Sequence, residues 1–397
     1  MKGKILFVGL LLCYTVHSQT LQEDTLSVRA ILDSNGLFSQ QTEKLIDISG
    51  DRVISLRLDS LDIRFLPASI GNLTSLRMLS ICNTSLTSLP GEIGRLVELR
   101  KLRLTGNRLT NISDSIAQLK NLIYLHLDNN GFSTLPFEIT SLSSLREISI
   151  SNNKLKKLPD SLHSLKELKF LYADNNQITV LPQTIGQLKK LEILRLSNND
   201  LGALPPSIVE LSKLRKLDIS GNHITTLPAD LGKLSSLTDL YIDNNRISAL
   251  PVSVSGLKNL TWIKADKNRI SQLPSEIGKL NKLQLLSLES NGLSSLPESL
   301  TDLSELSVLN ASENALTTLP DSISRLKNIK ILLLGGNNIK TLPITITELT
   351  FGQGESRLEL SKNRLCGIPE ELKIWLDSQK ASWEGQQCRK QAGTESR

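Results

Sequence analysis

Apolar residues recur along most of the chain with a period of 23 residues, beginning at Val53. Each unit reads L-x-x-L-x-L-x-x-N-x-L-x-x-L-P-x-x-I-x-x-L-x-x, in which the x positions are mostly polar. Thirteen units follow one another without a slip, and a fourteenth begins at Glu355 after a three-residue insertion around residues 351–354. A fixed period of this length predicts one stack of similar units rather than several separate globular domains.

The first part of each unit predicts a short strand. Its pattern alternates, so that Leu102 and Leu104 point into the core and Arg103 points outward. The second part predicts a short helical or 3-10 segment, because positions 14, 18 and 21 are apolar with helical spacing. Proline fills position 15 in thirteen of the fourteen units and suits the first turn of such a segment.

Asparagine fills position 9 in twelve of the fourteen units, from Asn107 to Asn363. An amide side chain both donates and accepts hydrogen bonds, so stacked asparagines can satisfy buried backbone groups where the chain leaves each strand. Leu61 and Thr84 hold this position in the first two units, so the ladder is expected to be weaker there. Strands pack about 4.8 Å apart and helical segments need more room, so the stack is expected to curve with its strands on the inner side.

This pattern resembles the leucine-rich repeat family, and the resemblance covers about residues 53–376. It implies an α/β fold, a right-handed horseshoe solenoid with a parallel concave sheet of about 14 strands and short helical or 3-10 convex segments. The ends of such a stack expose leucine side chains, so caps are required. We expect an N-terminal cap at residues 19–52, fourteen repeats at 53–376, and a C-terminal cap and tail at 377–397. Both ends resemble the caps of secreted bacterial proteins of this family.

The N-terminus predicts a secretory signal peptide at residues 1–18. Lys2 and Lys4 supply its positive region, residues 5–13 are nearly all apolar, and cleavage is placed after Ser18. A membrane anchor would need a longer apolar stretch, and a lipoprotein signal would need a small residue before Cys13. No later apolar run reaches about 18 residues, so no transmembrane segment is expected. The mature protein is expected to be secreted or extracellular, with the cell surface and the periplasm as alternatives.

The two caps carry their own signals. In the N-terminal cap, Asp24 is expected to cap a helix that Asn35 and Gly36 end, with apolar residues Leu26, Val28, Ile31 and Leu32. In the C-terminal cap, residues 372–377 are expected to be helical.

Cys366 and Cys388 are predicted to form a disulfide that ties the C-terminal excursion over the exposed end of the core. The prediction follows from the signal peptide, because cysteine pairs persist in the oxidising compartment to which it sends the chain. Cys82 lies in the second unit, too far from either cysteine, and is expected to stay a free thiol. The alternative is that Cys366 and Cys388 stay unpaired, as in a cytosolic protein.

Charge and spacing argue against catalysis and nucleic acid binding. The formal charge of the chain is +6, and loss of two lysines with the signal peptide leaves +6 − 2 = +4, too mild to indicate nucleic acid. His126 and His223 would lie four strands apart, at about 4.8 Å each, so they cannot share a metal ion. Cys82 lies two strands from His126, too far for a nucleophile–base pair. No enzyme activity, metal or cofactor is expected, and we interpret the acidic stack at position 7 as a solvated edge rather than a calcium site: Asp243, Asp266 and Glu289.

Positions 3 and 5 of each unit point from the strands into the horseshoe, where they predict a binding surface. By chance these 28 positions would hold about one of the twelve aromatic residues left after signal cleavage, yet they hold five. Aromatic residues favour strands in general, but these five are confined to units four to ten. Charged residues surround them in the same positions. We predict that a partner binds this set: Arg103, Tyr124, His126, Phe170, Tyr172, Arg195, Asp218, Tyr241, Trp262 and Lys264.

An apolar stripe continues the same positions toward the C-terminus. It consists of Leu285, Val308, Ile331 and Leu333, and is typical of a partner surface unless the insertion at 351–354 covers it. We interpret the chain as a non-enzymatic, extracellular, monomeric scaffold that binds a protein ligand across its concave face. Two alternatives remain, namely carbohydrate binding, in which aromatic faces stack on sugar rings, and an adhesive or structural role at a surface.

Overall fold

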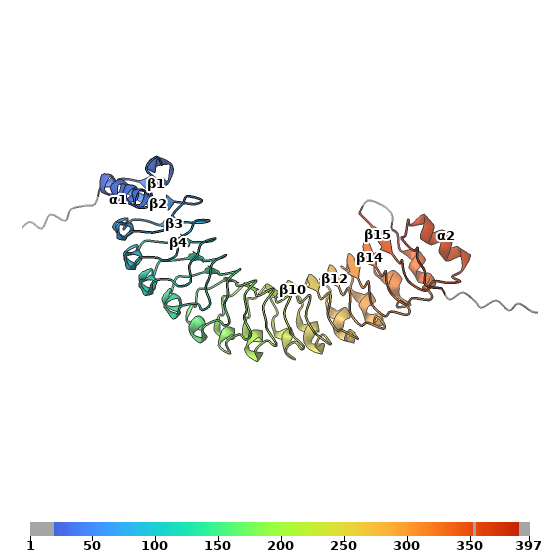
Figure 1. Ribbon diagram of the computed structural model, residues 1–397. Helices are drawn as coiled ribbons and strands as arrows, with labels where there is room; N and C mark the ends of the chain where they lie inside the picture. The colour runs from blue at the N-terminus through green and yellow to red at the C-terminus, as the bar shows by residue number, and fades with distance from the viewer. Residues whose placement is uncertain (1–19, 352–354, 389–397) are drawn as a thin grey trace, which may run out of the picture.

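A computed structural model describes residues 20–351 and 355–388 of the 397-residue chain. The chain forms a curved solenoid with its strands on the inner side and short helical turns on the outer side (Figure 1). The predicted signal peptide at residues 1–18 and the last residues of the tail lie outside the described residues. Among the residues described, no helix is long and apolar enough to cross a membrane.

A single sheet of fifteen strands lines the concave face, and neighbouring strands in the sequence are neighbours in the sheet. The repeat region supplies β2 to β15, which are all parallel and in register, as predicted for fourteen units. The strands are β1 (Ile46–Ser49), β2 (Arg52–Arg57), β3 (Met78–Ser80), β4 (Lys101–Arg103), β5 (Tyr124–His126), β6 (Glu147–Ser149), β7 (Phe170–Tyr172), β8 (Ile193–Arg195), β9 (Lys216–Asp218), β10 (Asp239–Tyr241), β11 (Trp262–Lys264), β12 (Leu285–Ser287), β13 (Val308–Asn310), β14 (Ile331–Leu333) and β15 (Arg357–Glu359).

The convex segments of the repeats are 3-10 helices, which confirms the expectation of short helical turns. Proline stands just before many of them, as Pro136 does before η5, and fixes an extended approach to the turn. They are η2 (Ala68–Asn72), η3 (Gly91–Arg95), η4 (Asp114–Gln118), η5 (Phe137–Ser141), η6 (Asp160–Ser164), η7 (Ile185–Gln187), η8 (Pro206–Glu210), η9 (Leu231–Lys233), η10 (Val252–Gly256), η11 (Ser275–Lys279), η12 (Glu298–Asp302), η13 (Ile323–Arg325) and η14 (Ile344–Glu348). A further short turn, η1 (Thr42–Lys44), belongs to the N-terminal cap.

Leucine and isoleucine side chains fill the space between the sheet and the 3-10 helices in one continuous core. The predicted asparagine ladder runs beside this core. Asn222 donates through Nδ2 to the carbonyl oxygens of Leu196 and Ile219, at 3.0 and 2.9 Å, and accepts from the amide of Leu201 at 2.9 Å. The same bonds recur from Asn107 to Asn363, so each amide joins its own repeat to the preceding one. The ladder is therefore confirmed.

The N-terminal cap differs in part from the expectation. Its helix α1 (Leu21–Asp33) begins after Thr20, whose hydroxyl accepts from the Glu23 amide in a capping box, so Asp24 is not the capping residue. Asp24 is instead fully buried and accepts hydrogen bonds from the side chain of Arg52 and the amide of Val53, which join the helix to the first repeat. The cap also adds β1, which pairs with β2 in the antiparallel direction.

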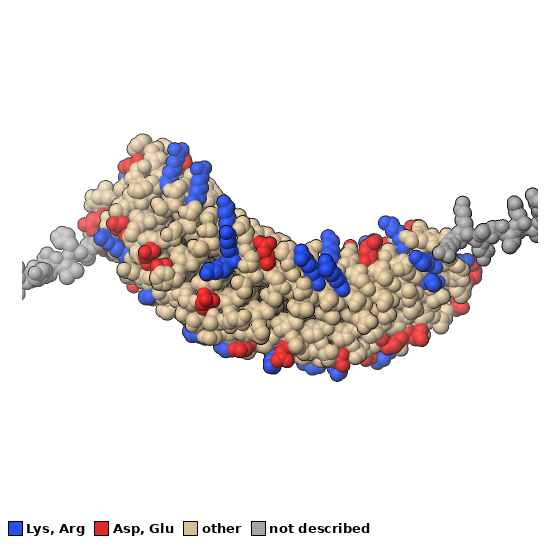
Figure 2. Space-filling view, turned by 60° about the horizontal axis from the view of Figure 1, so that its bottom comes forward, with Lys and Arg blue, Asp and Glu red and all other residues tan. Residues whose placement is uncertain are grey.

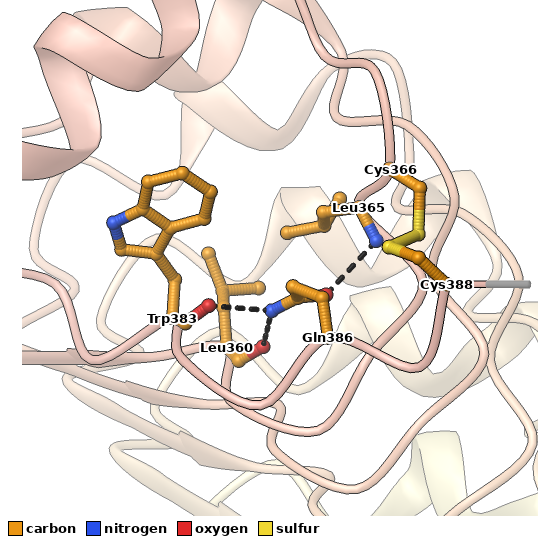
Figure 3. The surroundings of a disulfide bond; sticks show 6 residues. All are labelled: Leu360, Leu365, Cys366, Trp383, Gln386 and Cys388. Atoms are coloured by element: carbon orange, nitrogen blue, oxygen red, sulfur yellow. Dashed lines mark hydrogen bonds between the residues drawn. A yellow bond between two sulfur atoms is a disulfide. The ribbon is translucent and has the colours of Figure 1, made fainter. Parts of the chain in front are cut away.

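The C-terminal cap continues the repeat for one further turn. After α2 (Glu370–Ser378), Ser382 forms a parallel bridge with Glu359 of β15. Gln386, which lies 23 residues after Asn363, takes the place of the ladder asparagine: it accepts from the Leu365 amide and donates to the carbonyls of Leu360 and Trp383 (Figure 3).

The predicted disulfide lies at the same end of the solenoid. Cys366 and Cys388 are bonded, with Cα atoms 5.7 Å apart (Figure 3). Cys82, at the other end of the solenoid, is free and buried. Both halves of the cysteine prediction are confirmed. The indole of Trp383 packs against the core and donates to Asp377 at 3.1 Å, so the bridge and the indole together hold the excursion on the last repeat.

Candidate functional site

All ten residues predicted to bind a partner lie on the concave face, in two parallel rows. The first residue of each three-residue strand, position 3 of the repeat, forms the third-position row, which contains Tyr124, Phe170 and Trp262. The last residue of each strand, position 5, forms the fifth-position row. In-register pairing places its members side by side on successive strands: Arg103, His126, Ser149, Tyr172, Arg195, Asp218, Tyr241 and Lys264.

The N-terminal part of this face is basic and aromatic. The ammonium group of Lys101 lies 5.7 Å from the centre of the Tyr124 ring, and 38% of Tyr124 is exposed. His126, beside Arg103 in the sheet, contacts the carboxylate of Glu147 on the next strand at 2.9 Å. These contacts orient the imidazole of His126 and the ring of Tyr124 while leaving both side chains in contact with solvent.

Arg195 organises the centre of the face. Its guanidinium group lies 3.0 Å from a carboxylate oxygen of Asp174 and 6.0 Å from the centre of the Tyr172 ring. Burial, followed by the negative charge of Glu147, raises the pKa of Tyr172, so this hydroxyl stays protonated in neutral solution. The centre therefore presents a neutral phenol beside a fixed cation.

Tyr241 lies among opposite charges from three strands. The ammonium groups of Lys216 and Lys264 lie 4.5 and 5.9 Å from the centre of its ring, and its hydroxyl donates to Asp239 at 3.4 Å. Burial, and then the nearby carboxylates of Asp239 and Asp218, raise the pKa of Tyr241 to about 12. The side chain of Tyr241 is thus neutral, its hydroxyl proton is engaged by Asp239, and cations lie beside its ring.

The third-position row becomes apolar beyond Tyr241. Trp262 is 41% exposed, and register pairs it with Leu285, which in turn pairs with Val308. Phe351, at the start of the insertion, is buried, and residues 352–354, expected as a possible cover for this stripe, lie outside the described residues. The face therefore combines an apolar row with a mainly polar row along the same strands.

His126, His223 and Cys82 lie on separate repeats, and two carboxylates of the acidic stack accept hydrogen bonds from backbone amides. Burial raises the pKa of the Cys82 thiol, which disfavours the reactive thiolate. Asp266 accepts from the Ser287 hydroxyl and the Glu289 amide, and Asp243 accepts from the Asp266 amide, so our interpretation of this stack as a solvated edge was wrong. These half-buried carboxylates terminate strands, and no group of three or more metal-ligating side chains occurs within residues 20–351 and 355–388.

Sequence reasoning missed several groups that shape the site. Glu147 holds position 3 of its repeat, so its place on the concave face could be predicted from the repeat pattern. Its contact with His126 could not be predicted in that way. Asp174 lies at position 7, just beyond the strand, and reaches back to Arg195. Lys101, Lys216 and Asp239 also hold position 3 of their repeats, and the structure places the two ammonium groups beside tyrosine rings and the carboxylate at the Tyr241 hydroxyl.

Comparisons with known proteins agree with this architecture. Sequence profiles described as "Leucine-rich repeat region" match residues 52–168 and 118–198, and profiles described as "Leucine rich repeat" match five overlapping segments between residues 174 and 339. No curated protein sequence matches the chain.

Among solved structures, a leucine-rich repeat protein of Leptospira interrogans is 33% identical with a TM-score of 0.71, covering 83% of this chain and 90% of that one. The leucine-rich repeat ectodomain of an Arabidopsis thaliana membrane receptor kinase, solved in complex with Casparian strip integrity factor 2, is 27% identical with a TM-score of 0.64, covering 84% of this chain and 44% of that one. An internalin of Listeria monocytogenes shares the fold at 23% identity, with a TM-score of 0.67 and coverage of 82% and 92%. The repeat, the curved parallel sheet and these matches together show that the chain belongs to the leucine-rich repeat family.

Proposed function

We propose that the chain is an extracellular scaffold that binds a protein partner across its concave face and performs no catalysis of its own. The observation that carries the proposal is the continuous band of aromatic and charged side chains on seven neighbouring strands, β5 to β11. A sheet stacked in this way holds side chains in fixed rows, so a large partner would meet a preorganised surface with little loss of entropy.

The composition of the band favours a protein partner. Protein interfaces draw most of their binding energy from aromatic and arginine side chains at the centre, with charged groups around them. Trp262 and Tyr124 lie near the two ends of the band, and both keep more than a third of their surface exposed. Charges of both signs alternate between them, which suits a partner of mixed charge rather than a polyanion.

An extracellular location rests on two features. The Cys366–Cys388 bridge is of the kind that persists in oxidising compartments, and residues 1–18 have the sequence of a signal peptide. The receptor ectodomain described above was solved in complex with Casparian strip integrity factor 2, and this relative supports a ligand-binding role here.

The test is capture of a partner from the medium in which the protein naturally acts. The immobilised mature protein is compared with a Tyr172→Ala/Trp262→Ala variant and with a control, Phe137→Ala. Phe137 is 68% exposed on the convex helix η5. We expect the wild type and the control to retain the same protein and the double variant to lose it while keeping its melting temperature. Equal retention by all three would exclude the concave face as the binding surface.

A further inference from the structure

A second surface with a distinct chemistry follows the exit of the strands. Positions 10 and 12 of each repeat flank a buried residue and lie between the concave sheet and the convex helices, and we call this side the exit flank. Across the fourteen units these positions hold eight bases and two acids, so they are strongly basic. In the N-terminal half the bases are Arg64, Arg108, Lys154 and Lys156, all exposed. Basic side chains spaced along the rim of the solenoid, with few acidic ones between them, are visible in Figure 2.

Most of these bases lack an acidic partner. Within the part of the chain that the structure describes, Arg64 pairs with Asp62, but no ion pair joins a carboxylate to Arg108, Lys154 or Lys156. The opposite side, which we call the entry flank, precedes the strands at positions 2, 22 and 23. Fourteen bases hold these positions, and within the described residues four of them pair with acids of neighbouring repeats, as in Lys169–Glu192 and Lys189–Glu210. Both flanks therefore carry bases without an ion pair in the described part of the chain, and the exit flank differs from the entry flank in the hydroxyl groups that lie beside its bases.

Hydroxyl groups on the exit flank are equally available. Position 12 is serine or threonine in nine of the fourteen units, and these nine residues are exposed. On the entry flank, the hydroxyls of Ser236, Thr238 and Thr261 donate to backbone carbonyls of the preceding repeat. Among the described residues no such bond engages the position-12 hydroxyls, for example those of Thr87 and Thr110. They can therefore bond to a ligand instead.

Two hollows mark the ends of this flank, and each is bounded by a pair of bases. Near the N-terminal cap, Arg64 and Arg108 border a hollow of about 390 Å³ together with the hydroxyls of Ser85 and Thr87. Near the C-terminal cap, Lys340 and Arg364 border another of about 630 Å³. Arg64, Arg108 and Lys154 belong to the first, third and fifth units, so they recur every two repeats, about 10 Å along the solenoid. This spacing is close to the length of one disaccharide.

We propose that the exit flank is a docking surface for an acidic polysaccharide. Carboxylate or sulfate groups at intervals of one disaccharide would meet successive bases, and sugar hydroxyls would bond to the position-12 serine and threonine hydroxyls. A lipid surface would use the bases but has no need of the row of hydroxyls. Because the exit flank is separate from the concave rows, the protein can hold a polysaccharide and a protein partner at the same time. Attachment to an acidic matrix would then position the concave face.

The experiment measures binding of polygalacturonate and dextran sulfate to the mature protein, with neutral dextran as the reference polymer. The exit-flank variant Arg64→Glu/Arg108→Glu/Lys154→Glu is compared with an entry-flank control, Arg100→Glu/Arg146→Glu/Arg215→Glu, which makes the same change in net charge at exposed arginines. We expect at least one acidic polymer to bind in a salt-sensitive manner, with affinity reduced about tenfold in the exit-flank variant and less than about twofold in the control. A Thr87→Val/Thr110→Val variant should lose affinity without a change in salt dependence.

Three results would overturn the proposal. The first is an equal loss in the two charge variants, which would mean that only net charge matters. The second is binding of neither acidic polymer. The third is tighter binding to phosphatidylglycerol vesicles than to either polymer with the same dependence on the exit-flank bases, which would identify the surface as a membrane-docking face. Concave-face variants serve as a separate arm, because failure of the protein-partner proposal leaves polysaccharide binding unchanged.

Discussion

Replacing one ladder asparagine with leucine gives the sharpest test of what holds neighbouring repeats together. Asn337 is 4% exposed, donates to the carbonyls of Ala311 and Leu334 at 2.9 Å each, and accepts from the amide of Leu316 at 3.0 Å. Leucine has a similar size but cannot make any of these bonds. The neighbouring Asn338 is only half-buried, so the same substitution there is a matched control within one repeat.

The size of the stability loss depends on which backbone groups lose their only hydrogen-bond partner. The carbonyls of Ala311 and Leu334 each keep a bond from an adjacent ladder residue, Asn314 and Asn363 respectively. The amide of Leu316 has no such second partner among the hydrogen bonds of the described residues. One orphaned buried amide, with two weakened carbonyls, predicts a loss of about 2–4 kcal/mol for Asn337→Leu. For Asn338→Leu we expect a change within about 0.5 kcal/mol.

Urea unfolding and hydrogen exchange together measure this effect. Because each repeat contacts only its neighbours, the loss should open the stack locally before the whole chain unfolds. We therefore expect a lower unfolding midpoint for Asn337→Leu and faster amide exchange in peptides that contain Leu316. The exchange rates of the first repeats should change less. Equal midpoints and equal exchange for the Asn337 and Asn338 variants would refute the claim that the amide ladder joins the repeats.

Three further predictions concern the caps and the tyrosines. Non-reducing mass spectrometry should show Cys366 joined to Cys388 and a free thiol at Cys82, and reduction should lower stability by about 3 kcal/mol in the chain-entropy model. Gln386→Leu should speed exchange in the last two repeats, whereas Gln386→Asn should retain part of the protection, and no difference between the two would contradict the role of this amide. Burial raises the pKa of Tyr241 from about 10 in the unfolded chain to about 12 in the folded protein, so the folded state holds this proton more tightly. The resulting contribution to stability is present below about pH 10 and should be lost as pH rises from about 10 to about 12. The unfolding midpoint should therefore fall more steeply over that range in the wild type than in Tyr241→Phe.

The repeat region was predictable because one rule acts fourteen times. The same apolar positions recur in every repeat, so a wrong assignment in one repeat would disagree with the repeats beside it. The strands and turns therefore follow from a single pattern. The caps lack that redundancy. Asp24 precedes a helical pattern and has the right chemistry for a capping residue, yet Thr20 caps the helix and the Asp24 carboxylate binds the first repeat. A choice between two polar groups four residues apart depends on tertiary contacts, which a local pattern does not contain.

The same contrast separates the place of the candidate site from its internal contacts. Alternation along a strand determines which side chains face the concave side, so Tyr172, Tyr241 and Trp262 could be placed from the period alone. The approach of Arg195 to Asp174, and of Lys216 to Tyr241, depends on the rotamers of long side chains. Those rotamers depend on the charges of side chains on neighbouring strands, and the in-register stack is what brings these charges together.

Selection for stacking acts on a limited set of positions. The leucines at positions 1, 4 and 6, the asparagine at 9 and the apolar residue at 11 face the core or the ladder, and almost every repeat keeps their chemistry. Positions 3 and 5 on the concave side and positions 10 and 12 on the exit flank contribute little to that packing, so they are free to differ between repeats. What distinguishes one member of this architecture from another must therefore lie in those positions. In this chain they carry an aromatic band on one side and a row of bases and hydroxyls on another, which is why we assign its binding functions to these two surfaces.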